Sequence, residues 1–157
     1  MIDLKKLRQF LIDGNKSTYA AGDTAKRTIE SDKSTTMIFE SGDWKLHDNY
    51  FGGEPYGGRE VVFFQDQPVY MMVYYGLVDE SVTDFKAVYG FLQKSLLLMP
   101  ENHPYRGPRE YTEGDFEYKN SYIGEIDYFS GEEIIYQNDQ EIYRAKYIGG
   151  LVDQRKE

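Results

Sequence analysis

Phe39-Glu-Ser-Gly-Asp-Trp44 and Tyr111-Thr-Glu-Gly-Asp-Phe116 are two versions of one sequence, 72 residues apart in the chain. The match continues in two further pairs of segments: Asp48-Asn-Tyr-Phe-Gly52 with Asn120-Ser-Tyr-Ile-Gly124, and, after one added residue, Glu60-Val-Val-Phe63 with Glu133-Ile-Ile-Tyr136. Self-similarity at a fixed spacing is the sequence signature of an internal repeat. The chain is therefore predicted to be a duplication of one structural unit.

Each repeated segment follows a stretch with the pattern of an amphipathic helix. Residues 2–13 and 82–98 carry apolar side chains at the spacing of one helix face. Gly14 is expected to cap the end of the first helix, and Pro100 to end the second. Runs of strand-forming residues bounded by turn residues predict the strands, which cover residues 43–51, 60–65, 69–75, 115–123, 132–137 and 141–148.

These elements predict an α+β fold. Two internally duplicated helix-plus-three-strand units are expected to pack as one domain, with an antiparallel sheet and pseudo-twofold symmetry. Copy one spans residues 1–78, copy two spans residues 79–152, and residues 153–157 form a tail. A chain of 157 residues has the length of one ordinary domain and can bury a core without disulfides or metals.

The two copies differ in two respects. Copy one contains a polar insertion at residues 20–35, which is interpreted either as a flexible loop or as a lid over a functional site. The last strand of copy one also has two apolar faces. Tyr70, Met72 and Tyr74 are predicted to face the core, and the opposite face, with Val73 and Tyr75, is expected to be covered, most simply by a helix.

Composition and motifs exclude several functions. The absence of Cys excludes disulfides, thiolate nucleophiles and Cys-ligated zinc. A net charge of −9 argues against nucleic-acid binding, which depends on basic surfaces. No apolar run approaches the roughly 20 residues that span a bilayer, and no signal peptide begins the chain, so a cytoplasmic protein without membrane association is expected. No metal-binding or phosphate-binding motif is present, and no metal or cofactor is predicted.

The loops that follow the two helices are the predicted ligand site. Tyr19 and Tyr105 occupy corresponding positions there, and Arg106 adds a planar cation. Aromatic rings beside an arginine suit a small planar or anionic ligand held between the two repeats. Trp44 and Tyr50 of the first predicted strand are included in this site. The alternative interpretation is that Tyr19 and Tyr105 are core residues beneath the helix ends.

Glu60 and Glu133 are corresponding acids at the starts of two predicted strands. If the units pack about a twofold axis, both could reach one cleft and act as a general acid and base, as in a hydrolase. The alternative is that each is a solvated residue at a strand end. In the ligand-binding interpretation, both are counted among the residues of the site.

The chain resembles a bacterial and phage domain of unknown function that often follows the helix-turn-helix of Xre-type transcription regulators. Four segments carry the resemblance: Thr18-Tyr-Ala20, the Gly-rich segment before Glu60, Pro104-Tyr-Arg-Gly-Pro108 and Glu113-Gly-Asp-Phe-Glu-Tyr118. The resemblance implies an effector or sensor module and supplies no catalytic residues. Because the first predicted helix begins at Ile2, no helix-turn-helix is expected before it.

Three functions are consistent with these features. The first is a non-enzymatic small-molecule-binding domain that senses or sequesters a signal. The second is a protein-interaction or inhibitor module, or a homo-oligomer, that uses the apolar outer face of copy one. The third is a hydrolase that uses Glu60 and Glu133.

Overall fold

The computed structural model describes residues 2–155 as two α-helices, one 3-10 helix and nine strands. In chain order they are α1 (Leu4–Ser17), η1 (Tyr19–Thr24), β1 (Thr28–Ile29), β2 (Thr35–Ser41), β3 (Trp44–Gly52), β4 (Tyr56–Phe64), β5 (Gln67–Val78), α2 (Phe85–Leu97), β6 (Glu110–Glu113), β7 (Phe116–Glu125), β8 (Tyr128–Gln137) and β9 (Gln140–Leu151). The predicted α+β class and the antiparallel sheet are confirmed.

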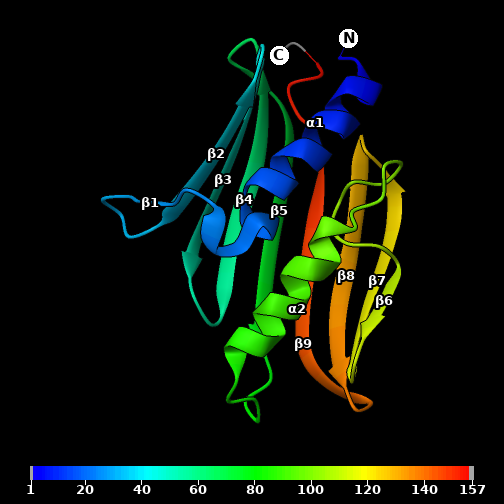
Figure 1. The fold of residues 1–157 in the computed structure, drawn as a ribbon. Coiled ribbons are helices and arrows are strands. Elements are labelled where there is room, and N and C mark those ends of the chain that lie inside the picture. The colour runs from blue at the N-terminus through cyan, green and yellow to red at the C-terminus, as the bar shows by residue number, and fades with distance from the viewer. Residues whose placement is uncertain (1, 156–157) are drawn as a thin grey trace.

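All nine strands join one antiparallel sheet in the order β1-β2-β3-β4-β5-β9-β8-β7-β6. Two meanders, β2 to β5 and β6 to β9, therefore meet along β5 and β9 (Figure 1). The pairing between these two strands places Tyr74 opposite Tyr147 and Gly76 opposite Ala145. The sheet is continuous from one half of the chain to the other, and its hydrogen bonds tie the two halves together.

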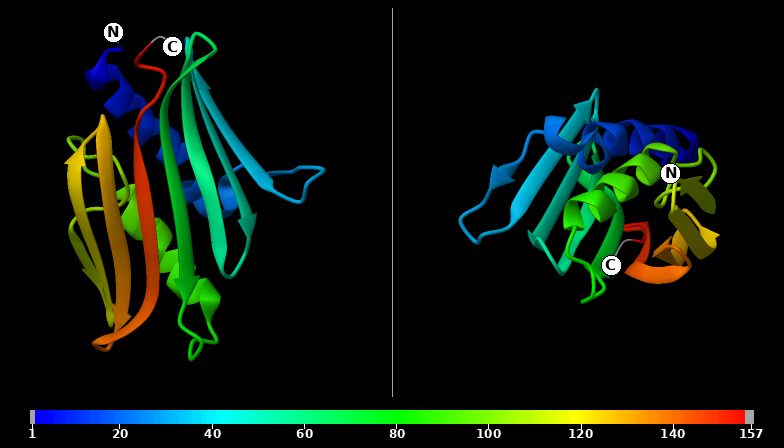
Figure 2. Two further views of the ribbon diagram at one scale, coloured as in Figure 1. Left: turned by 180° about the vertical axis from the view of Figure 1, so that it is seen from behind. Right: turned by 60° about the horizontal axis from the view of Figure 1, so that its bottom comes forward.

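Both α-helices lie on the same face of the sheet, and the sheet curves around them (Figure 2). The core forms between this inner face and the apolar sides of the helices. Its members include residues of α1 (Leu7, Phe10, Leu11), of α2 (Val88, Phe91, Leu92, Leu96) and of the sheet (Leu46, Val62, Tyr70, Tyr118, Ile135, Tyr143). Neither α-helix has the length and hydropathy needed to cross a bilayer, a statement that covers the described residues.

The predicted cap at Gly14 is wrong. Helix α1 starts after the Asp3 carboxylate, which accepts hydrogen bonds from the backbone N–H groups of Lys5 and Lys6. It then runs past Gly14 to Ser17, and the Thr18 N–H donates to the Gly14 carbonyl at 2.9 Å. Gly14 instead allows α1 to pack closely on the sheet, because a Cβ there would lie 2.9 Å from Leu46 Cδ1 and the leucine side chain would have to move.

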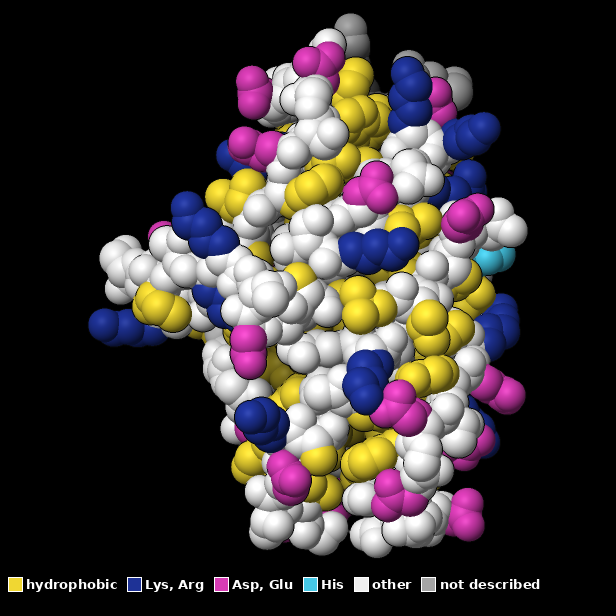
Figure 3. Space-filling model, in the orientation of Figure 1, with side chains coloured by type: hydrophobic (Ala, Val, Ile, Leu, Met, Phe, Trp, Pro, Cys, Tyr) yellow, Lys and Arg dark blue, Asp and Glu magenta, His cyan; other side chains and the backbone are white. Residues whose placement is uncertain are grey.

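The polar insertion is built from regular elements. Residues 20–35 contain most of η1, the short strand β1 and the turn into β2. The Asn49 side-chain amide of β3 fixes this turn by donating to Ser34 Oγ at 2.8 Å and to Thr36 Oγ1 at 3.0 Å. Strands β1, β2 and β6 were not predicted, so the N-terminal half has five strands and the C-terminal half four, rather than three each. The β1–β2 hairpin projects from the side of the molecule (Figure 3).

The two faces of β5 differ as the alternation predicts. Tyr70, Met72 and Tyr74 are buried on the inner face, which confirms the core assignment. The predicted helix over the outer face is wrong, because both α-helices pack on the inner face. Val73, Tyr75 and Leu77 remain 45%, 56% and 45% exposed.

Candidate functional site

A cavity of about 220 Å³ opens beside the end of α1, between α2 and the inner face of β3, β4 and β5. The residues that line it come from both α-helices, η1, three strands, the β3–β4 turn and the loop after α2. They are Asn15, Tyr19, Asp48, Tyr50, Gly52, Gly53, Tyr56, Glu60, Tyr74, Tyr89, Gln93 and Arg106. The cavity wall thus contains five tyrosines, two carboxyl groups and one guanidinium.

The two carboxyl groups lie directly opposite each other in the sheet. Asp48 of β3 and Glu60 of β4 are register partners on the inner face, and they are 5% and 3% exposed. Asp48 Oδ1 accepts a hydrogen bond of 2.5 Å from the Tyr74 hydroxyl. Glu60 Oε2 accepts a long one of 3.4 Å from the Asn15 amide, and Glu60 Oε1 has no partner within the described part of the chain.

Burial and mutual repulsion change the protonation of this pair. Burial, followed by the charge of Asp48, raises the pKa of Glu60 to about 8, against the attraction of Arg106 and the Asn15 hydrogen bond. Burial also raises the pKa of Asp48 to about 6, although the Tyr74 hydrogen bond and Arg106 favour its charged form. Near neutral pH, Asp48 is therefore mainly ionised and Glu60 mainly protonated.

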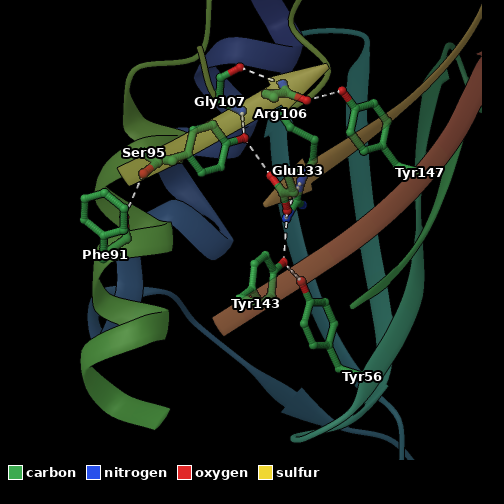
Figure 4. A network of polar contacts seen from close by, with 10 residues as sticks. Tyr56, Phe91, Ser95, Arg106, Gly107, Glu133, Tyr143 and Tyr147 are labelled. Carbon is green, nitrogen blue, oxygen red and sulfur yellow. Dashed lines mark hydrogen bonds and ion pairs between the residues drawn. The ribbon is translucent and has the colours of Figure 1, made fainter. Parts of the chain in front are cut away.

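Arg106 lines the cavity, and Glu133 balances its charge. Its Nε donates to Glu133 Oε1 at 3.0 Å, and its Nη2 contacts the same oxygen. The Tyr118 hydroxyl donates to Glu133 Oε2 at 2.7 Å and the Tyr143 hydroxyl to Oε1 at 3.0 Å. The Tyr143 and Tyr56 hydroxyls are hydrogen-bonded at 2.5 Å, which extends this network to the cavity wall (Figure 4).

The C-terminal half contains the same arrangement with different charges. Asn120 and Glu133 are register partners in β7 and β8, and the Tyr147 hydroxyl donates to Asn120 Oδ1 at 2.6 Å. Asn120 therefore stands where the N-terminal half has Asp48. Arg106 follows Tyr105 in the loop after α2, whereas Ala20 follows Tyr19 after α1. Compared with the C-terminal half, the N-terminal half has one additional acid, Asp48, and lacks a counterpart of Arg106.

The structure brings together four of the seven predicted ligand-site residues, since Tyr19, Tyr50, Glu60 and Arg106 line the cavity. Glu133 lies behind Arg106 as its ion-pair partner. Tyr105 is buried elsewhere in the core, where its ring stacks on Phe129 at 3.8 Å between centroids.

The seventh residue, Trp44, packs against Phe10 at 5.5 Å and Phe64 at 4.7 Å between ring centroids, outside the cavity. The interpretation of Glu60 and Glu133 as solvated strand ends is wrong, because both are buried. Sequence reasoning missed Asp48, Tyr56 and Tyr74. The register of the β3–β4 hairpin, had it been predicted, would have placed Asp48 beside Glu60.

Tyr70 is a buried neighbour of this site, and its hydroxyl has no hydrogen-bond partner in residues 2–155. Tyr70→Phe is expected to raise the free energy of unfolding by about 1 kcal/mol, because the variant removes an unpaired buried polar group and keeps the ring. Urea denaturation measures the change. The matched control is Tyr118→Phe, which removes a hydroxyl that donates to Glu133 and should lower stability. A destabilised Tyr70→Phe would contradict this account of the hydroxyl.

The side chains of residues 2–155 form no cluster suited to a metal ion. No group of three or more His, Asp or Glu residues in the described part of the chain could hold a metal ion, and the chain contains no Cys. The site consists of carboxyl groups, phenols, amides and one paired guanidinium.

Comparisons with known proteins identify a family. No curated protein and no solved structure matches the chain. A family model described as a domain of unknown function (DUF5680) matches residues 48–152. The match begins at Asp48 and includes Glu60, Arg106 and Glu133, and Asn15 and Tyr19 precede it. The family model covers well over half of the chain, so the chain belongs to the DUF5680 family.

Proposed function

We propose that this protein is a non-enzymatic small-molecule-binding domain whose ligand occupies the cavity beside Asp48 and Glu60. The observation that carries the proposal is Glu60 Oε1, a buried carboxyl oxygen in the cavity wall without a hydrogen-bond partner among the described residues. Buried polar atoms are nearly always paired, so an orphaned one at a cavity marks the place of a missing partner. A bound ligand would supply that partner.

The size of the cavity limits the ligand. A volume of about 220 Å³ lies below the roughly 300–1,000 Å³ of pockets for drug-sized molecules. The ligand is therefore a small metabolite or a small group of a larger molecule. The walls contributed by Tyr19, Tyr50, Tyr56 and Tyr89 give it aromatic contacts.

Native mass spectrometry of the purified protein against a metabolite extract tests this function. The wild-type protein is expected to retain a small adduct, and Tyr50→Ala is expected to retain much less, because the variant removes one wall of the cavity. Tyr136→Ala is the matched control, since Tyr136 is a partly buried tyrosine of β8 that does not line the cavity. No adduct, or one that Tyr50→Ala retains fully, would contradict the proposal.

The other predicted functions have less support. An anionic ligand depended on Arg106, and Glu133 already balances that charge. A hydrolase depended on Glu133 as an acid or base, and both Glu133 oxygens accept hydrogen bonds from Arg106 or tyrosines. A protein-interaction or homo-oligomer function through the outer face of β5 is the second candidate, favoured by the exposure of Val73, Tyr75 and Leu77.

Light scattering after size exclusion tests the second candidate for self-association. A second copy of the chain packed on the outer face would give a mass above the monomer at high concentration, and Tyr75→Lys should restore the monomer mass. A monomer at all concentrations would contradict the homo-oligomer form of this candidate.

We also infer that the two halves arose by duplication and are related by a pseudo-twofold axis. Three corresponding contacts support this: Tyr74 with Asp48 and Tyr147 with Asn120, the pairing of Asp48 with Glu60 and of Asn120 with Glu133, and the pairing of Tyr74 with Tyr147 across β5 and β9. An axis through the last contact would relate the two halves of the sheet.

A further inference from the structure

We propose that the cavity ligand is a small organic cation, a protonated amine, whose charged group lies against the carboxyl groups of Asp48 and Glu60. This inference rests on the proposed small-molecule-binding function and adds the chemical class of the ligand. It is carried by four features of the described residues: the charges around the cavity, the unpaired carboxyl oxygen, the aromatic walls and the comparison between the two halves of the chain.

Acidic groups outnumber basic groups around the cavity. Asp48, Glu60 and Glu133 are three acids in contact with or directly behind the wall, and Arg106 is the single base among them. Glu133 and Arg106 compensate each other, which leaves Asp48 and Glu60 without a cation. Uncompensated buried charges are costly, so a site that keeps two adjacent acids is suited to a ligand of positive charge.

The groups that face Glu60 are polar or acidic, apart from the basic guanidinium of Arg106. Helix α1 presents the Asn15 amide, β3 presents Asp48, and β5 presents the hydroxyls of Tyr70 and Tyr74. Glu133 of β8 lies behind Arg106. Two atoms of this set lack a hydrogen-bond partner among the described residues, Glu60 Oε1 and the Tyr70 hydroxyl, and of the two only Glu60 Oε1 belongs to a residue that lines the cavity.

An ammonium group matches these acceptors. It offers three N–H donors and no acceptor, so it can donate to Glu60 Oε1 and to the Asp48 carboxylate together. The rings of Tyr19, Tyr50, Tyr56 and Tyr89 form much of the remaining wall. Aromatic faces attract cations, most strongly in desolvated sites. A neutral donor could pair with Glu60 Oε1 but would leave the negative charge unbalanced, and an anionic ligand would add to that charge.

The C-terminal half provides an internal reference for the inference. There, Glu133 receives the guanidinium of Arg106 from its own half, and its register partner is the neutral Asn120. In the N-terminal half the loop residue after Tyr19 is Ala20, and the register partner of Glu60 is Asp48. The chain thus fills one of two similar acidic positions with its own cation and leaves the other open to the cavity.

Binding of a cation must be coupled to the protonation of Glu60. Burial and the charge of Asp48 raise the pKa of Glu60 to about 8, so the empty site holds a proton there at neutral pH. A cation favours the carboxylate, and its binding therefore releases that proton. Affinity should rise between pH 6 and pH 8 by up to about tenfold per pH unit for one proton released.

Isothermal titration calorimetry with probes of one size tests the inference. The probes are butylamine, butanol and butyrate, which share a four-carbon chain and differ in charge. At pH 8, butylamine is expected to bind at least about tenfold more tightly than the other two, because only it gains a charge-assisted contact. In two buffers of different ionisation enthalpy, butylamine binding at pH 7 should show proton release.

Two variants test whether butylamine binds at Glu60. Glu60→Gln should weaken butylamine binding by about tenfold or more and abolish the proton release, because the amide cannot ionise. Glu132→Gln is the matched control, because Glu132 belongs to the outer face of the sheet with Arg144 and Lys146. The affinity of Glu132→Gln for butylamine should equal that of the wild-type protein.

The outcomes separate this inference from the proposed function. If butanol or butyrate binds as tightly as butylamine, and Tyr50→Ala weakens the binding, the cavity is a ligand site and the cationic class is wrong. If no probe binds but Tyr50→Ala abolishes a metabolite adduct in native mass spectrometry, the cationic class is again overturned and the function survives. If no probe binds and no adduct is found, both fail.

Discussion

Arg106→Met is expected to lower the free energy of unfolding by about 3–5 kcal/mol, because it leaves the Glu133 carboxylate buried without its cation. Arg106 and Glu133 are 7% and 0% exposed and are joined through both Nε and Nη2 of the guanidinium. Breaking a buried pair from one side costs far more than the pair contributes, since the remaining charge stays desolvated. Chemical denaturation of the two proteins at pH 7 measures the difference.

The double variant Arg106→Met/Glu133→Gln separates the pair from its surroundings. It should be more stable than Arg106→Met alone, because the second substitution removes the unpaired charge. The matched control is Lys94→Met. It breaks the exposed ion pair between Lys94 and Glu113 and should change stability by at most about 1 kcal/mol. A loss in Arg106→Met no larger than in Lys94→Met would show that the buried pair is not structurally important.

The alternation of side chains along β5 and the helical spacing in α1 and α2 were sufficient to predict the class of the fold. Tyr70, Met72 and Tyr74 face the core, as a period of two requires. Gly14 was misread because a glycine after a helical pattern resembles a C-cap, and its real constraint is the approach of Leu46 from β3. A contact between segments so distant in sequence leaves no local signal.

The candidate site was only partly predictable for the same reason. Tyr19 and Tyr105 occupy corresponding positions in sequence, but only Tyr19 reaches the cavity, because the ring of Tyr105 fills the core against Phe129. Glu60 and Glu133 were recognised as corresponding acids. Their different electrostatic environments depend on cross-strand partners, Asp48 and Asn120, and on which loop supplies an arginine. These are properties of register and packing.

The stability of the ligand-free protein is expected to fall by about 2–3 kcal/mol between pH 6 and pH 8, because of Glu60 alone. Burial raises the pKa of this carboxyl group from its ordinary value of 4.5 to about 8 in the folded protein, so the folded state binds its proton more tightly than the unfolded state. A group of this kind contributes stability that is fully present below the unfolded pKa and lost as the pH rises through the folded pKa.

Glu60→Gln removes this group and isolates its effect. The variant should show a much flatter profile between pH 6 and pH 8, measured by denaturant titrations at each pH. It should retain the decrease between about pH 4 and pH 6 that belongs to Asp48, whose pKa is raised to about 6 by burial. Glu80→Gln is the control, because Glu80 is an exposed acid in the turn before α2.

A cationic ligand should weaken this loss of stability toward pH 8. Butylamine at a concentration well above its dissociation constant would stabilise the ionised form of Glu60 in the folded state, and the loss of stability toward pH 8 would shrink or disappear. Glu60→Gln should show little of this effect. A wild-type profile as flat as that of Glu60→Gln would mean that the carboxyl group titrates as it does in the unfolded chain. The ionised form of Glu60 would then not be destabilised by its surroundings, and the site would not favour a cationic ligand.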